Sequence, residues 1–271
     1  MVRLFCFWYR GKLGFVEQLC LTSMVRSGHP VDLFTYDSDL PVPAGVNLKD
    51  AGTIVPESKV IRHQKTGSLA LFSDIFRYEG LRQNAGIWLD LDILVLRDLD
   101  GMGSYVFGWE SETIINGAVL HLPADSACLR NIVSLYTAST VVAPFWNAPR
   151  KVYQITRSLV GKQLPLQQLG WGIIGPRAIT HYVKSEGLVS RAQPVDVFYP
   201  IHHSEVELLL KPDVRVEDRL TSSTRAVHLW KSTLQPLLQQ PLHKASFLGR
   251  MCEHFDVEPT ATRGAVAVAA T

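Results

Sequence analysis

Residues 4–36 run LFCFWYRGKLGFVEQLCLTSMVRSGHPVDLFTY, and this stretch decides the fold. The apolar run Leu4–Trp8 predicts a buried strand. Apolar residues then recur at helical spacing over Phe15–Arg26, and Ser27-Gly28-His29-Pro30 ends that helix. Residues 31–36 predict the next strand. A strand, a helix and a strand in this order form a βαβ unit, so we expect a parallel sheet.

The rest of the chain extends this alternation. The clearest helix is predicted over residues 68–83, where apolar residues form a stripe on one face. A strand is predicted to enter at residue 87 and to continue through Asp90-Leu91-Asp92 to residue 96. Other predicted strands are 46–48, 105–109, 114–120 and 226–230, and other predicted helices are 126–138, 152–160 and 179–185. We therefore expect an α/β fold with a mixed, mainly parallel sheet flanked by helices, and a small C-terminal helical and loop portion.

Length and composition narrow the class of protein. The 271 residues predict a single domain over residues 1–257, followed by a disordered tail over 258–271. A net charge of +2 without a long Lys/Arg run argues against nucleic-acid binding and against strong electrostatic binding to a membrane. The four scattered cysteines suit free thiols, and no apolar run is long enough to span a bilayer. We expect a cytoplasmic protein, compatible with peripheral membrane contact.

The pair Asp90 and Asp92 is the first candidate site. In an extended chain residues i and i+2 point to the same side, so both carboxylates would reach one point while Leu91 faces the core. Two adjacent carboxylates repel each other unless a cation neutralises them. Mn²⁺ or Mg²⁺ fits, because hard cations take oxygen ligands. An acidic surface loop is the alternative, because the Asp-x-Asp pattern is common by chance.

Ser73, Asp74 and Arg77 form a second candidate, on the predicted helix that precedes the acidic pair. Spacings of three and four residues place them on neighbouring positions of one helix face. If this helix packs beside the strand that carries Asp90, Asp74 could bind a ribose or sugar hydroxyl, and Arg77 a hydroxyl or a phosphate oxygen. An exposed Asp–Arg pair worth little energy is the alternative.

Together these residues resemble a known family. Leu69-Ala70-x-x-Ser73-Asp74-x-x-Arg77-Tyr78-x-x-Leu81 followed by Gly86-Ile87-Trp88-Leu89-Asp90-Leu91-Asp92 is similar to the sugar-binding region of retaining glycosyltransferases with the GT-A fold. These include bacterial capsular polysaccharide transferases, α-1,4-galactosyltransferases and α-1,6-mannosyltransferases. Asn116-Gly117-Ala118, Trp171-Gly172, Gly175-Pro176 and the closing His228-Leu229-Trp230 recur in the same order, so the resemblance covers roughly residues 4–232.

The resemblance implies roles for the matching positions. Trp8 would stack on the nucleotide base, and Ser73, Asp74 and Arg77 would hold the ribose and the donor sugar. Asn116 would contact the sugar. Asp90, Asp92 and His228 would hold the metal, with Asp92 as the firm ligand. Trp230 and Lys231 would border the diphosphate, where Lys231 adds a positive charge.

The resemblance predicts a metal-dependent glycosyltransferase. It would move a sugar from a nucleotide-diphosphate donor to an acceptor hydroxyl with retention, with a UDP-sugar favoured over a GDP-sugar. The acceptor could be a glycan, a lipid-linked glycan or a protein. Asp90, Asp92 and Arg77 would carry the chemistry, and the resemblance implies front-face attack, in which the leaving phosphate helps to deprotonate the acceptor hydroxyl. A double displacement is the less favoured alternative; it would need a nucleophile near the anomeric carbon, and Glu110 and Glu112 are its candidates. The alternatives are a non-catalytic nucleotide-sugar-binding protein and another metal-dependent nucleotide-sugar enzyme, a hydrolase or a nucleotidyltransferase.

Overall fold

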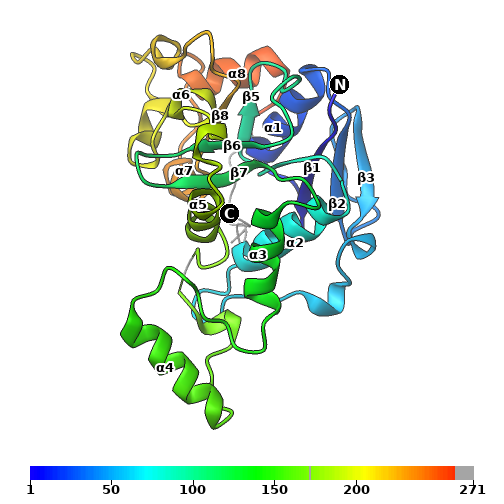
Figure 1. Cartoon of the computed structure of the whole chain (residues 1–271). Helices are drawn as coiled ribbons and strands as arrows, with labels where there is room; N and C mark the ends of the chain where they lie inside the picture. The colour runs from blue at the N-terminus through cyan, green and yellow to red at the C-terminus, as the bar shows by residue number, and fades with distance from the viewer. Residues whose placement is uncertain (171, 260–271) are drawn as a thin grey trace.

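A six-stranded sheet forms the centre of the computed structural model, which describes residues 1–170 and 172–259 (Figure 1). Its strands, in their order across the sheet, are β3 (Val46–Asp50), β2 (Val31–Thr35), β1 (Leu4–Trp8), β4 (Ile87–Leu89), β7 (Ile115–His121) and β6 (Val106–Trp109). The first four strands are parallel, and β7 is antiparallel to both of its neighbours. The predicted α/β class with a mixed, mainly parallel sheet is confirmed.

Strand β1 shows why the sheet is covered on both faces. All five of its side chains are buried, and they alternate between two hydrophobic clusters. Leu4, Cys6 and Trp8 join the cluster that includes helix α1 (Phe15–Arg26). Phe5 and Phe7 join the cluster that includes helix α2 (Ala70–Arg82). An unbroken apolar run is typical of a strand buried on both faces, so the short segment Leu4–Trp8 could be assigned from sequence.

The predicted strand 87–96 is wrong in one respect, because the chain turns at Asp90-Leu91-Asp92. Ile93 N–H donates to the carbonyl oxygen of Asp90 over 3.1 Å, which closes a turn after β4. The chain then enters β5 (Ile93–Val95), which pairs with β8 (Ala226–His228) in a separate two-stranded antiparallel sheet. Continuous apolarity could not distinguish one strand from two strands joined by a turn.

Further helices complete the layers around the sheet. They are α3 (Ala127–Thr137), α4 (Ala148–Leu159), α5 (Pro176–Ser185), α6 (Val195–Phe198), α7 (Lys231–Leu234) and α8 (Phe247–Phe255). Short 3-10 helices lie at Ala51–Thr53, Glu57–Lys59, Leu166–Gln168, Val189–Arg191, His203–Leu210, Val216–Arg219 and Gln235–Leu237. Helix α8 packs against α1, where Arg26 donates to the carbonyl oxygen of His254 over 2.8 Å. The C-terminal helix α8 thus packs on α1 and extends the hydrophobic cluster that α1 forms with one face of the sheet.

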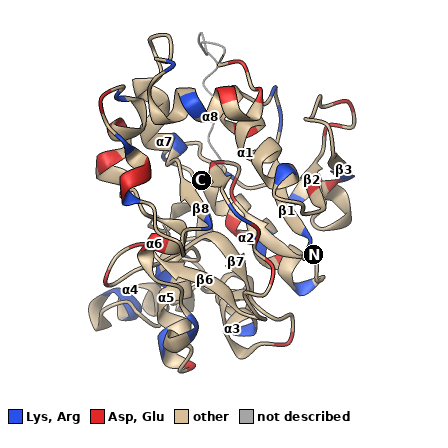
Figure 2. Ribbon diagram, turned by 90° about the horizontal axis from the view of Figure 1, so that it is seen from above, with Lys and Arg blue, Asp and Glu red and all other residues tan. Residues whose placement is uncertain are grey.

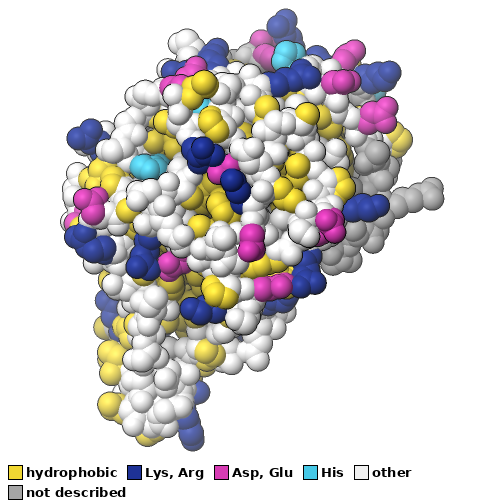
Figure 3. All heavy atoms as spheres, turned by 90° about the vertical axis from the view of Figure 1, so that its right-hand side faces the viewer, with side chains coloured by type: hydrophobic (Ala, Val, Ile, Leu, Met, Phe, Trp, Pro, Cys, Tyr) yellow, Lys and Arg dark blue, Asp and Glu magenta, His cyan; other side chains and the backbone are white. Residues whose placement is uncertain are grey.

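Helix α4 differs from the others in its position. It projects away from the body of the molecule as an arm, and the space-filling view shows the same projection from another side (Figures 1 and 3). The charged residues of the body lie mainly on helices and loops, whereas strands β6 and β7 carry no Lys, Arg, Asp or Glu (Figure 2).

Three further sequence predictions concern single segments. The four cysteines are free and buried in the part of the chain that the structure describes. None of the described helices combines the length and the apolarity needed to cross a membrane. The predicted tail lies outside the described residues except for Glu258 and Pro259, as does Trp171.

Candidate active site

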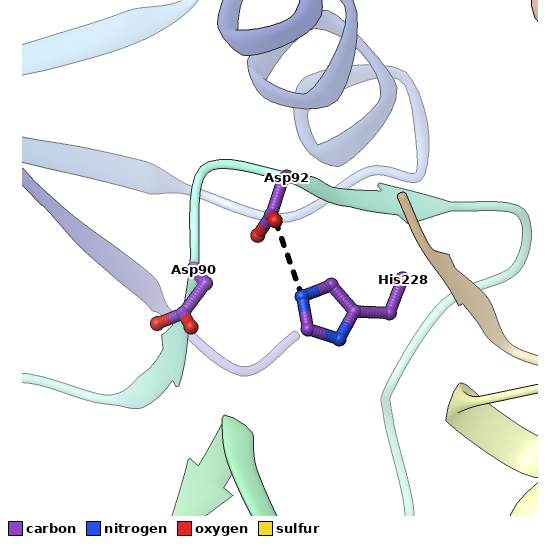
Figure 4. Close-up of side chains that lie close together, drawn as sticks. All are labelled: Asp90, Asp92 and His228. Carbon is purple, nitrogen blue, oxygen red and sulfur yellow. Dashed lines mark hydrogen bonds and ion pairs between the residues drawn. The ribbon is translucent and has the colours of Figure 1, made fainter. Parts of the chain in front are cut away.

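Asp90, Asp92 and His228 converge where the two sheets meet (Figure 4). All three are buried, and one ligand atom from each lies within 4.8 Å of the others. Asp90 directly follows β4, Asp92 directly precedes β5, and His228 is the last residue of β8. The pairing of Ile93 with His228 sets the register that brings Asp92 and His228 together. A turn and a strand pairing therefore build the cluster.

Each carboxylate has one oxygen held by the protein and one that is not. Asp90 Oδ1 accepts from Arg77 Nη2 over 2.9 Å and from Trp88 Nε1 over 2.6 Å. Asp92 Oδ2 accepts from the Lys231 N–H over 2.8 Å and lies 3.2 Å from His228 Nε2. Asp92 Oδ1 and His228 Nδ1 are buried without a hydrogen-bond partner among the described residues. Buried polar atoms rarely stay unpaired, so these residues fit a bound cation.

Charge and burial act in opposite directions on these groups. Burial raises the pKa of Asp90 above its usual value, and Arg77 offsets only part of that shift. Burial alone would also raise the pKa of Asp92, but His228 and the Lys231 N–H outweigh it, and the pKa of Asp92 is lowered. Burial would lower the pKa of His228, yet Asp92 and Asp90 raise it. The cluster therefore favours positive charge at its centre.

Arg77 links the acidic cluster to helix α2. Its guanidinium lies 3.3 Å from Asp74 Oδ1 and 2.9 Å from Asp90 Oδ1, and it is 5.0 Å from the ring centroid of Trp88. Burial raises the pKa of Asp74 to about 6, because Arg77 compensates for only part of the lost hydration. The helix thus places a cation between the buried carboxylate of Asp90 and the partly buried carboxylate of Asp74.

The segment after β8 holds Asp92 from the other side. Trp230 adopts a left-handed backbone conformation, with φ 51°, which is uncommon outside glycine and costs energy. This turn directs the Lys231 N–H at Asp92. The Lys231 side chain points away and pairs with Glu17, a buried residue of α1. The ion pair therefore ties α1 to the start of α7, and through it to Asp92.

A cavity of about 330 Å³ opens above the cluster. Its volume falls within the range of small-molecule sites. Its lining residues are His63, Ala70, Leu71, Asp74, Arg77, Asp90, Asp92, Glu110, Ile114, Asn116, Gly117, Leu166, Leu169, Gly170, Gly172, Pro176, Arg177, His228, Trp230 and Ser232. The acidic cluster, Arg77 and Arg177 thus line the same cavity as several apolar side chains.

The structure brings most of the predicted site residues to this cavity. Those that line it are Asp74, Arg77, Asp90, Asp92, Asn116, His228 and Trp230. Trp8 and Ser73 are buried and do not line it. The Trp8 indole donates to the Gly11 carbonyl oxygen over 2.7 Å, and Lys231 Nζ lies 5.0 Å from its ring centroid. Trp8 and Lys231 therefore pack beneath the site in this structure and do not face the cavity.

Several cavity and supporting residues were not predicted. Arg177 follows Gly175-Pro176 at the start of α5, and a proline in the first turn is a helix-start signal that could have drawn attention to it. Glu17 sits among apolar residues on the buried face of α1, and an acidic residue in such a stripe is itself a signal. His63 lies in a loop, and nothing in its sequence context marks it as a cavity residue.

The two candidate nucleophiles differ in position. Glu110 lines the cavity and accepts a hydrogen bond from Asn116 over 2.7 Å, whereas Glu112 is exposed and does not line the cavity.

Sequence similarity to one known protein indicates the class of this chain. No family model matches the sequence. Human lactosylceramide 4-alpha-galactosyltransferase is 26% identical over 184 residues, which are 62% of this chain and 43% of that protein. The chain thus spans less than half the length of this relative. Among solved structures, PaToxG glycosyltransferase is similar with a TM-score of 0.42 and 14% identity, over 70% of this chain and 71% of that chain. The sequence similarity supports the glycosyltransferase class.

Proposed function

We propose that this chain is a metal-dependent glycosyltransferase that takes its sugar from a nucleoside-diphosphate donor and retains the anomeric configuration. The observation that carries the proposal is the buried cluster of Asp90, Asp92 and His228 at the wall of a cavity. The name of the galactosyltransferase relative, which specifies an alpha linkage, supports the retaining class. We also propose that residues 1–257 act as one catalytic domain.

Asp90, Asp92 and His228 would hold Mn²⁺ or Mg²⁺. When bound, the cation would neutralise the diphosphate and stabilise the charge that grows on it as the sugar leaves. The protein's part is to keep the two carboxylates in place before the donor arrives. Arg77 and Trp88 fix Asp90, and Lys231 fixes Asp92 through its backbone N–H. Such preorganisation lowers the cost of reaching the charged transition state.

Arg77, Asp74 and Asn116 would orient the donor beside this cluster. Asp74 offers a carboxylate to a sugar or ribose hydroxyl, and Arg77 keeps that carboxylate aimed into the cavity. The Asn116 side chain bridges the Glu110 carboxylate and the Ala118 N–H, so its position is fixed as well. In a front-face reaction the leaving phosphate accepts the acceptor proton. In a double displacement Glu110 would be the nucleophile, because Glu112 lies outside the cavity.

A thermal-shift screen with UDP- and GDP-sugars, with and without Mn²⁺, tests the proposal. A ligand that binds only the folded state raises the midpoint of unfolding, and we expect a metal-dependent rise with one donor. Asp92→Ala should abolish it. Asp98→Ala is the matched control, because Asp98 belongs to a second Asp-x-Asp pattern at an exposed turn. Equal shifts in wild type and Asp92→Ala, or no shift with any donor, would overturn the proposal. Product analysis then separates transfer, which yields a new glycoside, from hydrolysis.

A further inference from the structure

Helix α4 buries a polar residue and exposes its apolar ones, which is the opposite of the usual arrangement. A surface helix normally buries its apolar face and exposes its polar one. In α4 the single buried residue is polar, Gln154, whose side chain exchanges two hydrogen bonds with the backbone of Leu164, at 2.8 and 3.1 Å. Its apolar side chains are exposed instead: Val152 by 58%, Ile155 by 46% and Leu159 by 80%. These three residues are three and four positions apart, so they form one stripe.

The surroundings of this stripe are positively charged. Between Asp125 and Glu186 the chain carries no acidic residue and seven basic ones, which are Arg130, Arg150, Lys151, Arg157, Lys162, Arg177 and Lys184. Figure 2 shows Lys and Arg, and no Asp or Glu, along α4. Within the described residues, Arg150, Lys151, Arg157 and Lys162 form no ion pair with a carboxylate. Arg150 stacks on Trp146, and Lys151 and Arg157 donate to backbone carbonyl oxygens, so their partners are neutral and their positive charge stays uncompensated.

The protruding shape of this region indicates which kind of partner it can bind. The stripe lies on an arm that stands out from the body, and Figure 3 shows hydrophobic side chains along the edge of this arm with Lys or Arg at its end. Leu159 and Val160, the most exposed apolar residues of the arm, are flanked by Arg157 and Lys162. A convex, basic helix with an exposed apolar stripe is suited to the boundary between headgroups and acyl chains of an anionic bilayer.

We propose that α4 docks this protein on an anionic lipid surface. Val152, Ile155 and Leu159 enter the apolar boundary, and the neighbouring Lys and Arg side chains meet the lipid phosphates. The proposal does not depend on the function proposed above. Together the two place the cavity near the membrane, because Leu166 and Leu169, which follow α4 in the chain, line the cavity.

Vesicle binding of the full chain tests this proposal. We expect wild type to sediment with vesicles of phosphatidylcholine and phosphatidylglycerol, weakly with phosphatidylcholine alone, and less as salt is raised. The double variant Val152→Gln and Leu159→Gln changes only exposed side chains and should bind on the order of tenfold more weakly. The pair Arg150→Gln and Lys162→Gln should weaken binding to anionic vesicles and reduce its salt dependence.

Matched controls lie elsewhere on the surface. Leu237→Gln and Val189→Gln change exposed apolar residues away from the arm, and Lys211→Gln with Arg215→Gln removes the same charge. All should bind as wild type does. The proposal is overturned if wild type ignores anionic vesicles, or if the α4 variants bind unchanged. It is also overturned if wild type is a dimer in solution that Val152→Gln and Leu159→Gln convert to monomer, since the stripe would then join two copies.

The same variants keep this proposal separate from the enzymatic one. Donor binding in the thermal-shift screen should be unchanged in the α4 variants, because none of their residues lines the cavity. Asp92→Ala should keep its vesicle binding. Loss of one property without the other therefore shows which proposal fails.

Discussion

Gly117 is the residue that makes room for Arg77. A Cβ added at this position would lie 2.2 Å from Arg77 Nη1 and 2.8 Å from Ile179 Cδ1. We expect Gly117→Ala to displace the guanidinium and to lower the free energy of unfolding by about 1–3 kcal/mol, the usual cost of overpacking. Chemical denaturation monitored by tryptophan fluorescence measures this change, and metal affinity should fall with it.

A double-mutant cycle tests the cause of that loss. Arg77→Met by itself should cost about 3–5 kcal/mol, because it leaves the buried Asp90 and the partly buried Asp74 without their cation. In the Arg77→Met background, Gly117→Ala should cost less than it does in wild type, since the clashing guanidinium is gone. Strictly additive costs would show that Gly117 acts through other contacts.

The raised pKa of Asp74 should make the free energy of unfolding depend on pH. Its pKa is about 6 in the folded protein and near 3.8 in the unfolded chain. The unfolded state therefore loses its proton first as pH rises, and the folded state loses stability between pH 3.8 and about 6. Asp74→Asn removes this titration. We expect the variant to be more stable than wild type at neutral pH by about 1–3 kcal/mol, with the gain vanishing near pH 4.

Urea unfolding across pH measures the gain from Asp74→Asn. Asp98→Asn, at an exposed carboxylate, should show no such pH-dependent difference from wild type. A gain that is constant with pH would contradict the argument. If Asp74 also holds the donor, the stabilised variant should bind nucleotide sugar less well, because active sites often keep groups that cost stability.

Single residues also show how much of the candidate site could be predicted from the sequence. Asp90, Asp92 and His228 could be selected, and the structure does bring them together. The predicted single strand was wrong, because two strands and a turn replace it, but both carboxylates do reach one point and Leu91 does lie in the core. The supporting pair of Lys231 and Glu17 could not be foreseen, since 214 positions separate these residues and only the packing of α7 on α1 unites them.

At the scale of elements, Gly80 sets the distance between α2 and β1. A Cβ at Gly80 would lie 2.4 Å from Phe5 Cε2. Gly80→Ala gains helix propensity of up to ~1 kcal/mol, but we expect a net loss of about 1–3 kcal/mol because the Phe5 ring has no space to move. Since α2 carries Asp74 and Arg77, donor binding should weaken too. Thermal unfolding and the donor-dependent shift measure the two effects.

A smaller partner should rescue this contact. Phe5→Leu alone leaves a cavity and costs stability, yet combined with Gly80→Ala it makes room for the added methyl group. The double variant should therefore be more stable than the sum of the two single losses predicts. If the double variant loses as much stability as the two single variants together, the helix shifts as a rigid body and Phe5 does not determine the cost.

Elements with strong apolar periodicity were predicted closely, and the others were not. Strand β1 and helix α1 match their predicted bounds, because their apolar patterns are unambiguous. Helix α8 was missed, although Ser246 caps it through the Gly249 N–H. Helix α4 begins at Ala148, four residues before its predicted start, since Asn147 caps it and Pro149 lies in its first turn. In both helices the cap carried the information that the apolar pattern lacked.

At the scale of the whole molecule, the packing predicts two parts of different stability, the body around the sheet and the arm that contains α4. Three of the parallel strands, β1, β2 and β4, are fully buried, whereas the arm that contains α4 buries one side chain of that helix, Gln154. A helix of 12 residues with so little tertiary packing is marginal in water. The arm should therefore open without the rest of the molecule, as weakly packed regions do.

Hydrogen exchange provides the last test, at the scale of the whole chain. The amides of α4 should exchange much faster than those of α2, a helix of similar length that contributes eight buried residues. Gln154→Ala should accelerate exchange in α4 further and leave α2 unchanged, because it removes the two hydrogen bonds to Leu164. Anionic vesicles should slow exchange in α4 alone, since burial of the exposed stripe supplies the packing that the arm lacks in water. Equal protection of α4 and α2 without vesicles would mean that the arm is held by contacts other than Gln154, and the two-part description would then be wrong.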